Sequence, residues 1–383
     1  MLASPRRAFA ILLPAAILSL AGVVAMVVLF IRLSWPHVEP LGNPEFGINF
    51  SCNYAEYLLL EDPAKGAAGY VSDDRPGRAE WCATTLGTLL RELRPQHLRL
   101  SVEWSEVEPV EGRFDFRLTD ALLAEAERQG TKVVLSVGLK AQRHPEYYIP
   151  GWVLAGTTVG DGSVISDEPR VREYSLRMIE RVVAHTSASP AIVGWGADNE
   201  PYIASSRAVG WTISREFVQE EVAAIRRNDP RDRPVSINHG QHFVFDRRWQ
   251  HALADSDALS VSMYPFRNDV FFGREVILPI LEIGPLAPNY AHQARSAHEA
   301  GKQFWITEMQ AEPWAEEDTR LHGPDNPLKN LDLEKFRRNV DYSRRSGADR
   351  VYFWGAEWWL FQRERFGDPR WMDEARAVFA GNY

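Results

Sequence analysis

The sequence predicts a (β/α)8 barrel that follows a single N-terminal transmembrane helix. The barrel is indicated by short β-rich runs that alternate with amphipathic stretches of helical periodicity across residues 45–383. These runs number eight, which is the strand count of a closed (β/α)8 barrel. The membrane helix is indicated by the uncharged segment 8–31 near the start of the chain.

The first predicted element in chain order is the membrane anchor. Residues 8–31 are 24 residues without a charge, and about 20 apolar residues suffice to cross the ~30 Å hydrocarbon core. A signal-peptide core is shorter, about 7–15 residues, so we expect an uncleaved signal anchor, with a cleaved signal peptide as the alternative. Arg6 and Arg7 favour a cytoplasmic position for residues 1–7. The rest of this single-pass chain would then lie on the extracytoplasmic side of the cell membrane.

Residues 32–44 are predicted to be a fairly stiff linker, because they contain three prolines and little periodicity. The barrel then occupies residues 45–383. Its predicted strands are Phe46–Phe50, His97–Val102, Lys132–Val137, Ile192–Gly196, Pro234–Asn238, Leu259–Met263, Gln303–Thr307 and Arg350–Trp354. Helical patterns between them include Glu80–Leu93, Leu118–Gln129, Val171–His185, Ser214–Arg227, Ala291–Ala300 and Leu333–Arg345. A doubly wound open sheet is the structural alternative, which is disfavoured because no glycine-rich phosphate turn follows the first strand.

Charge and cysteine content restrict the possible partners and sites. The formal net charge is −9, with acids and bases interspersed, and there is no basic stripe that would bind nucleic acid. Cys52 and Cys82 are the only cysteines, which excludes a disulfide scaffold and a cysteine-rich metal site. Whether the two form a bridge depends on the compartment and on the distance between their Cα atoms, so the sequence leaves it open.

Two glutamates follow predicted strands and mark the expected site. Glu200, in VGWGADNEPY, follows the fourth strand, and Glu308, in FWITEMQAEPW, follows the seventh. In a (β/α)8 barrel the carboxyl ends of the strands converge on one mouth, where catalysis takes place. The fourth and seventh strand ends lie across that mouth, so the two carboxyl groups are expected to face each other. Cleavage of a glycosidic bond requires such a pair, with one group protonated and the other ionised.

Longer motifs resemble clan A of the glycoside hydrolases. Asn-Glu-Pro after the fourth strand, with a glutamate that ends the seventh, resembles the catalytic pair of this clan. The segment LRLSVEWSEVEPVEGRFDF is similar to the second-strand region of families 10, 35 and 42. The chain as a whole resembles families 5, 10, 35 and 42, and the family is not resolved. The resemblance implies a retaining hydrolase of β-linked oligo- or polysaccharides that acts through a covalent glycosyl-enzyme intermediate and needs no cofactor or catalytic metal.

The resemblance also implies roles for individual residues. Glu200 matches the general acid/base and Glu308 the nucleophile. The predicted substrate-binding residues are Asn199 at the sugar 2-hydroxyl, Arg99 and Tyr264 beside the nucleophile, Trp354 as the floor of the sugar subsite, and Trp104, His144 and His239 at other strand ends. Core packing is the alternative for Trp354 and an exposed loop is the alternative for His144.

Other functions and other carboxylates remain open. A catalytically inactive sugar-binding barrel would normally lack one glutamate of the pair, whereas both are present. A metal-dependent barrel hydrolase would need His-x-His at the end of the first strand, which reads Ile48-Asn49-Phe50 instead. Asp198 and Glu312 are close to the pair in sequence and are the alternative carboxylates. The long loops 140–168, 264–290 and 309–332 would shape the cleft, so the sugar, the linkage, endo or exo action and the oligomeric state are not predicted.

Overall fold

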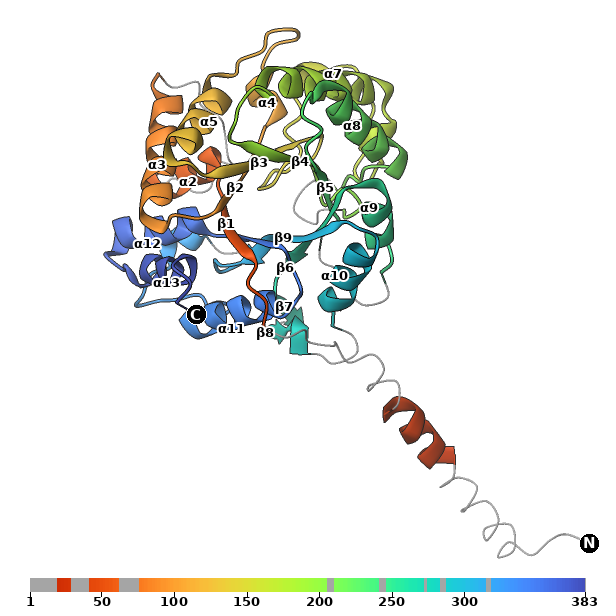
Figure 1. Cartoon of the computed structure of the whole chain (residues 1–383), viewed down its shortest axis with the longest axis vertical. Coiled ribbons are helices and arrows are strands. Elements are labelled where there is room, and N and C mark those ends of the chain that lie inside the picture. Colours follow the sequence, from red (N-terminus) through yellow and green to blue (C-terminus); the bar gives the residue numbers. More distant parts are fainter. Residues whose placement is uncertain are drawn as a thin grey trace, which may run out of the picture.

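Eight parallel strands close into a barrel in the computed structural model, and helices surround it (Figure 1). The structure describes residues 19–28, 41–61, 76–204, 210–240, 246–271, 274–282, 287–314 and 318–382. The barrel strands are β1 (Glu45–Asn49), β2 (His97–Ser101), β3 (Lys132–Val137), β4 (Ile192–Asn199), β5 (Val235–Asn238), β6 (Ala258–Met263), β9 (Gln303–Gln310) and β10 (Arg350–Trp354). Their order around the barrel is β1-β10-β9-β6-β5-β4-β3-β2, and all adjacent pairs are parallel. The predicted barrel is confirmed, and the open-sheet alternative is wrong because the sheet closes on itself.

Helices form the outer layer. They are α2 (Cys52–Leu59), α3 (Arg78–Leu93), α4 (Trp104–Val107), α5 (Arg117–Gln129), α6 (Gly151–Leu154), α7 (Pro169–Thr186), α8 (Arg215–Asn228), α9 (Trp249–Asp255), α10 (Tyr290–Glu299), α11 (Leu333–Arg344), α12 (Ala356–Phe366) and α13 (Arg370–Phe379). Helix α7 illustrates how the sequence specifies them. It begins with Pro169. Proline suits this position, because a backbone N–H in the first turn of a helix would have no intrahelical acceptor. Its buried side chains, among them Val171, Met178 and Val182, recur at helical spacing and cover the sheet.

Large side chains fill the inside of the barrel. Val134, Ala258, Trp305 and Tyr352 come from four different strands and form a buried cluster of their own. Trp305 of β9 reaches as far as β4, where a Cβ on Gly194 would lie 3.4 Å from its ring. The glycine therefore leaves room for the indole. Because the interior is packed, a ligand of this barrel has to bind at the mouth.

The structure contains further elements that the sequence pattern did not predict. An antiparallel hairpin of β7 (Phe266–Phe271) and β8 (Arg274–Pro279) occupies part of the predicted loop 264–290. Helix α2 follows β1 at once, where Ser51 caps it by accepting a hydrogen bond from the Tyr54 N–H. Cys52 of α2 and Cys82 of α3 form a disulfide with Cα atoms 5.5 Å apart. The bridge that the sequence left open therefore fixes α2 to α3.

The N-terminal segment is described only in part. Residues 19–28 are helical, and their large apolar side chains are exposed: Leu20, Val23, Val24, Met26, Val27 and Val28. The remaining residues of the predicted anchor, 8–18 and 29–31, lie outside the described residues, as do 1–7 and most of the predicted linker. Within the part of the chain that the structure describes, no helix is long and apolar enough to cross a membrane. Because more than half of the predicted transmembrane helix lies outside the described residues, it stays a prediction.

Candidate active site

Glu200 and Glu308 lie at the carboxyl ends of β4 and β9, which are separated in the barrel by β5 and β6. Each strand is irregular just before its glutamate. The register of β4 against β5 shifts between Gly196 and Asn199, and the register of β9 against β6 skips Thr307. An extra residue in a strand bends it locally and redirects the side chains that follow. The two bulges thus set the directions of both glutamates at the mouth.

The backbone at Glu200 has an unusual conformation. Asp198 and Glu200 have φ angles of 58° and 51°, a region that residues with a Cβ rarely adopt. Such a conformation persists only where the surrounding structure holds it, and it is enriched at functional sites. Here the Glu200 N–H donates to the carbonyl of Asn238 at 2.9 Å, and Lys140 Nζ donates to the carbonyl of Glu200 at 3.0 Å. The Glu200 side chain is therefore presented by a fixed backbone.

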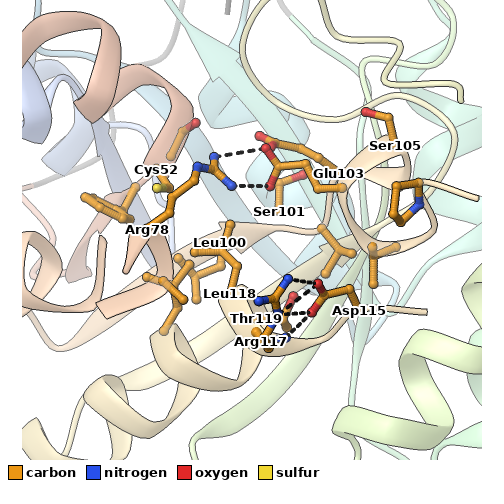
Figure 2. A pocket seen from close by; sticks show the side chains of 18 of the residues that line it. Cys52, Arg78, Leu100, Ser101, Glu103, Ser105, Asp115, Arg117, Leu118 and Thr119 are labelled. Carbon is orange, nitrogen blue, oxygen red and sulfur yellow. Dashed lines mark hydrogen bonds and ion pairs between the residues drawn. The ribbon is translucent and has the colours of Figure 1, made fainter. Parts of the chain in front are cut away.

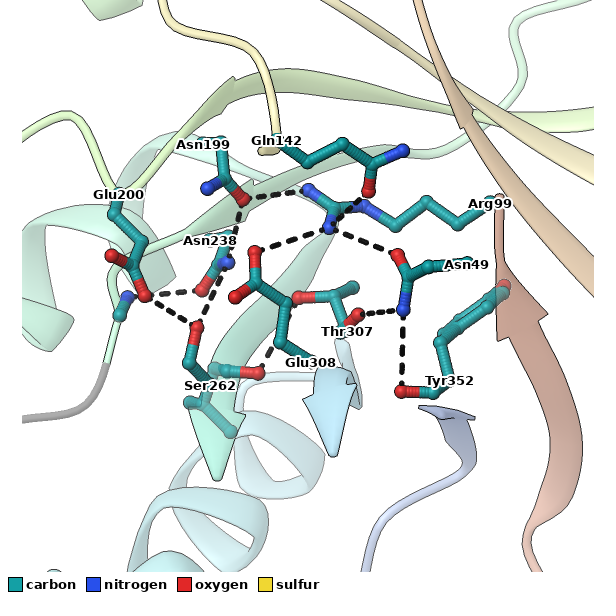
Figure 3. Close-up of polar contacts among 12 residues, drawn as sticks. Asn49, Arg99, Gln142, Asn199, Glu200, Asn238, Ser262, Thr307, Glu308 and Tyr352 are labelled. Carbon is teal, nitrogen blue, oxygen red and sulfur yellow. Dashed lines mark hydrogen bonds and ion pairs between the residues drawn. The ribbon is translucent and has the colours of Figure 1, made fainter. Parts of the chain in front are cut away.

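Amide and hydroxyl groups connect Glu200 to the centre of the mouth (Figure 3). Ser262 Oγ donates to Glu200 Oε1 at 2.5 Å. Asn238 Nδ2 donates both to Ser262 Oγ at 3.2 Å and to Asn199 Oδ1 at 3.0 Å. Because the Ser262 oxygen already accepts from Asn238, its proton is directed at Glu200. The carboxyl group of Glu200 is therefore held in one orientation.

Arg99 of β2 completes the connection to Glu308 (Figure 3). Its Nη2 donates to the same Asn199 oxygen at 2.9 Å, and its Nη1 lies 3.5 Å from Glu308 Oε1. Nη1 also donates to Gln142 at 2.9 Å and to Asn49 Oδ1 at 3.3 Å. Asn49 in turn donates to backbone carbonyls of the neighbouring strands β9 and β10. A continuous network of hydrogen bonds thus links the two glutamates through a buried cation.

Glu308 has a donor on each oxygen. Tyr264 donates its hydroxyl to Oε2 at 2.7 Å, opposite the contact of Arg99 with Oε1. Burial raises the pKa of Glu308, and repulsion from Glu200 raises it further, whereas Arg99, Tyr264 and Asn199 lower it. Two coupled carboxyl groups lose their protons in separate steps. Because the cation contacts Glu308, we assign the first negative charge to Glu308 and the remaining proton to Glu200.

Glu200 lies in surroundings that favour its protonated form. Burial raises the pKa of Glu200, although the positive charge of Lys140 and the hydrogen bond from Ser262 act in the opposite direction. The Lys140 side chain is itself buried and donates to the carbonyls of Glu200 and Ile203. A raised pKa suits a carboxyl group that has to deliver a proton near neutral pH.

Aromatic rings and a second buried cation border the pair. The Arg143 guanidinium lies over two aromatic rings, 3.7 Å from the ring centre of Tyr54 and 3.9 Å from that of Trp354. Trp354 is 7% exposed. On another side, Trp314 stacks on Tyr264 with ring centres 5.5 Å apart and is 39% exposed. An exposed indole beside the tyrosine that contacts Glu308 is well placed to stack on a ligand.

The remaining predicted site residues have different surroundings. His239 follows β5 and is buried next to the network, and its N–H donates to the carbonyl of Ser260. His144 is exposed on the loop after β3. Trp104 is almost fully buried, donates to Glu108 at 3.0 Å and packs edge-on against Trp152. The structure therefore brings together Arg99, Asn199, Glu200, Tyr264 and Glu308, but it places Trp104 in the packing between helices.

The alternative carboxylates point elsewhere. Asp198 accepts from the backbone N–H of Lys140 at 2.7 Å and shares a hydrogen bond with Glu221 of α8. Burial raises the pKa of both Asp198 and Glu221, which favours a proton shared within this pair. Glu312 pairs with Arg143.

Sequence reasoning missed part of the network. Asn49, Gln142, Arg143, Asn238 and Ser262 were not selected, although they contact the predicted residues or border them. One signal was present, because three of them, Asn49, Asn238 and Ser262, lie at the carboxyl ends of strands.

A separate pocket of about 480 Å³ lies between β2 and helices α3 and α5 (Figure 2). Neither catalytic candidate lines it. Arg78 in this pocket pairs with Glu56 at 2.8 Å and with Glu106 at 3.0 Å. Burial raises the pKa of the neighbouring Glu103 well above its usual range. These charged groups are already matched within the pocket, which is consistent with a structural role.

Comparison with known proteins points to one group of enzymes. The sequence profile of glycoside hydrolase family 42, described as beta-galactosidase, matches residues 87–217, which include Arg99 and Glu200. A beta-galactosidase of Arthrobacter sp. is 28% identical over 148 residues, which cover 36% of this chain and 20% of that protein. The beta-galactosidase BbgII of Bifidobacterium bifidum is 30% identical over 107 residues, which cover 25% of this chain and 15% of that protein. The predicted resemblance to clan A glycoside hydrolases is confirmed. The chain spans a fifth or less of the length of these curated relatives, and the family within the clan is not resolved.

Solved structures agree on the fold. Gan42B, a GH42 beta-galactosidase from G. stearothermophilus, was solved as a catalytic mutant and matches with a TM-score of 0.56 and 13% identity, over 90% of this chain and 57% of that one. GH5_18 from Bifidobacterium longum subsp. longum matches with a TM-score of 0.56 and 13% identity, over 89% of this chain and 80% of that one. At this level of identity the likeness establishes the barrel alone.

Proposed function

We propose that the protein is a retaining glycoside hydrolase that cleaves β-linked oligo- or polysaccharides. The observation that carries the proposal is the connected pair of glutamates at the ends of β4 and β9, with Arg99 and Tyr264 on Glu308. Glu308 attacks the anomeric carbon while Glu200 protonates the leaving oxygen, which gives a glycosyl ester of Glu308. Glu200 then deprotonates water, which releases the sugar with its configuration retained. The names of the relatives make β-galactosides the first substrates to test.

Neighbouring groups support the chemistry of each step. Arg99 and Tyr264 stabilise the carboxylate of Glu308 before attack. Once Glu308 is neutral as an ester, its repulsion no longer hinders the ionisation of Glu200, so Glu200 becomes the base. Asn199 is proposed to contact the sugar 2-hydroxyl, and Trp354 and His239 to border the same sugar. The sugar-binding roles of His144 and Trp104 stay predictions. His144 is exposed and Trp104 is buried, so both are less favourably placed to contact a sugar.

The competing functions lack this support. In an inactive sugar-binding barrel, Arg99 and Tyr264 would have no reason to hold the carboxylate of Glu308. Ser262 and Lys140 would likewise have no reason to hold Glu200. A metal-dependent hydrolase would use ligands at the end of β1, where Asn49 is committed to backbone carbonyls and to Arg99.

Stereochemistry tests the proposed function directly. The full-length chain is incubated with aryl β-galactosides, β-glucosides and β-glucans, with and without EDTA, and proton NMR follows the first product. Retaining enzymes hold their carboxyl groups ~5–5.5 Å apart, without room for an attacking water, so the β-anomer should appear first. First appearance of the α-anomer, or hydrolysis that EDTA abolishes, would contradict the proposal.

The pH dependence tests the role of Glu200. The charge of Lys140 lowers the pKa of Glu200, so Lys140→Met should raise that pKa. The alkaline limb of kcat/KM reports loss of the proton from the acid, and it should therefore move to higher pH. Lys140→Arg keeps the charge and is the matched control. An alkaline limb that stays in place in Lys140→Met, or moves to lower pH, would argue against Glu200 as the acid.

We also propose that residues 8–31 anchor the protein in a membrane, with the barrel on the extracytoplasmic side. The proposal is supported by the exposed apolar side chains of residues 19–28 and by the disulfide, which is typical of oxidising compartments. Membrane fractions washed at high pH should retain the chain with its N-terminus intact. A mature N-terminus near residue 26 would show cleavage and refute the anchor.

A further inference from the structure

Glu312, a carboxylate that the proposed mechanism does not use, lies at the edge of the candidate active site. It follows β9, four residues after Glu308, and is 4% exposed. One oxygen pairs with Arg143. The other, Oε2, is buried and has no hydrogen-bond partner among the described residues. A buried carboxylate oxygen without a donor is costly, so such an atom points to a donor supplied from outside the chain.

The surroundings hold Glu312 rigidly. Arg143 packs against the rings of Tyr54 and Trp354, and its Nη2 pairs with Glu357 Oε2 at 3.2 Å. Burial lowers the pKa of Arg143, but the charges of Glu312 and Glu357 outweigh it and raise this pKa above its usual value. The end of β10 packs closely on the same segment, because a Cβ on Gly355 would lie only 2.7 Å from Glu312 Cβ. The free oxygen therefore cannot turn away to find a partner.

A second unmatched group lies next in the chain to Arg143. Gln142 is 1% exposed, and its Oε1 accepts from Arg99, while its Nε2 has no partner within the described part of the structure. Gln142 connects this corner to Glu308 through Arg99. The charge of Arg143 also reaches Tyr264, whose pKa it lowers against the larger effect of burial. An unmatched acceptor on Glu312 and an unmatched donor on Gln142 thus lie in the group of residues around Arg143 and Arg99.

We propose that Glu312 is a specificity-determining residue that accepts a hydrogen bond from a hydroxyl of the sugar bordered by Trp354, other than the 2-hydroxyl. Gln142 Nε2 donates to a neighbouring oxygen of the same sugar. The inference rests on the proposed function and names its substrate class as neutral glycosides. A uronic acid is disfavoured, because Glu312 repels its carboxylate and both terminal nitrogens of Arg143 already carry carboxylate partners.

Glu312→Gln isolates the contact. Arg143 retains the amide oxygen, so the amide NH2 replaces the acceptor that faces the sugar. Activity of the full-length chain is measured on a dinitrophenyl β-glycoside and on its 3-, 4- and 6-deoxy analogues. For the wild type, one analogue should lose about 10- to 100-fold in kcat/KM, as expected for a hydrogen bond to a charged group. On the parent sugar, the kcat/KM of Glu312→Gln should be lower than that of the wild type by a similar factor. On that analogue, the substitution should lower kcat/KM only a little further.

Glu357→Gln is the matched control, because Glu357 pairs with the same arginine while its other oxygen accepts from the Ser51 N–H at 2.7 Å. Glu357→Gln should lower kcat/KM by the same factor on the parent sugar and on every deoxy analogue. Equal losses for Glu312→Gln on every analogue would mean that a buried water is the only partner and would overturn the proposal. The same coupling in Glu357→Gln would assign the effect to Arg143 instead and would also overturn it.

A measurement on the wild type covers the case in which Glu312→Gln does not fold. The wild type should prefer the neutral hexoside over the corresponding hexuronide by at least about 100-fold in kcat/KM. Equal rates would refute the role of Glu312 but leave the proposed function intact. Absence of hydrolysis of every glycoside would instead refute the proposed function, and the assignment of Glu312 with it.

Discussion

Replacing Glu308 by alanine is expected to reduce the turnover of every glycoside by at least about 10⁴-fold, whatever the leaving group. The reason is that the neighbouring carboxylates among the described residues are held elsewhere, and Glu312 pairs with Arg143. Glu200 lies on another strand and holds the proton, and Asp198 is paired with Glu221. Without Glu308 no glycosyl ester forms, so a better leaving group does not help.

Azide distinguishes loss of the nucleophile from loss of the fold. In Glu308→Ala, azide entering the vacated space attacks the anomeric carbon directly and displaces the leaving group, which gives the α-glycosyl azide from a β-glycoside. Glu308→Gln fills the same volume, keeps an oxygen acceptor for Arg99 and offers an NH2 that can donate to the Tyr264 hydroxyl oxygen, so it should melt close to the wild type and remain inactive with azide. Substantial activity of either variant on dinitrophenyl glycosides without azide would remove Glu308 from its role.

The barrel and the glutamate pair could be predicted because they depend on local pattern and on topology. A parallel strand buried on both faces reads as a continuous apolar run, as Val133–Leu135 of β3 does. In the closed barrel, the carboxyl ends of all eight strands then lie at the same mouth. Position in the topology thus selected Glu200 and Glu308 from 52 acidic residues.

The missed elements lack such a pattern. Helix α12 is buried over Ala356–Gln362 on all sides, so its sequence has no polar face and no helical period. The hairpin β7–β8 pairs without an Asn-Gly or Asp-Gly turn, the strongest local signal for a hairpin. Helix α12 owes its structure to packing against the rest of the fold.

The hydrogen-bond network could not be predicted for a different reason. Gln142 is 43 residues from Arg99 in the chain, and Ser262 is 62 residues from Glu200. Glutamine and serine are common at the ends of strands, and only the register of the closed barrel decides which of them meet. The same holds for Arg143, whose partners Glu312 and Glu357 come from the segment after β9 and from helix α12.

Replacing Glu200 by alanine should have an effect that depends on the leaving group, unlike the loss of Glu308. For alkyl and phenyl glycosides kcat/KM should fall about 10²- to 10⁴-fold, the usual contribution of a general acid. For dinitrophenyl glycosides the first step needs no proton and should be largely preserved. The second step still lacks a base, so the glycosyl ester on Glu308 should accumulate, with a burst of dinitrophenolate followed by slow turnover.

Azide should then rescue Glu200→Ala with the opposite stereochemistry to that of Glu308→Ala. Its nitrogen bonds to the anomeric carbon of the ester as the Glu308 carboxylate leaves, and two inversions give the β-glycosyl azide. Ser262→Ala is the matched control: it removes the hydroxyl that donates to Glu200 but keeps the carboxyl group, so a modest loss without azide rescue is expected. If Glu200→Ala instead lost activity equally on all leaving groups, or yielded the α-azide, the acid/base role would pass from Glu200 to another residue.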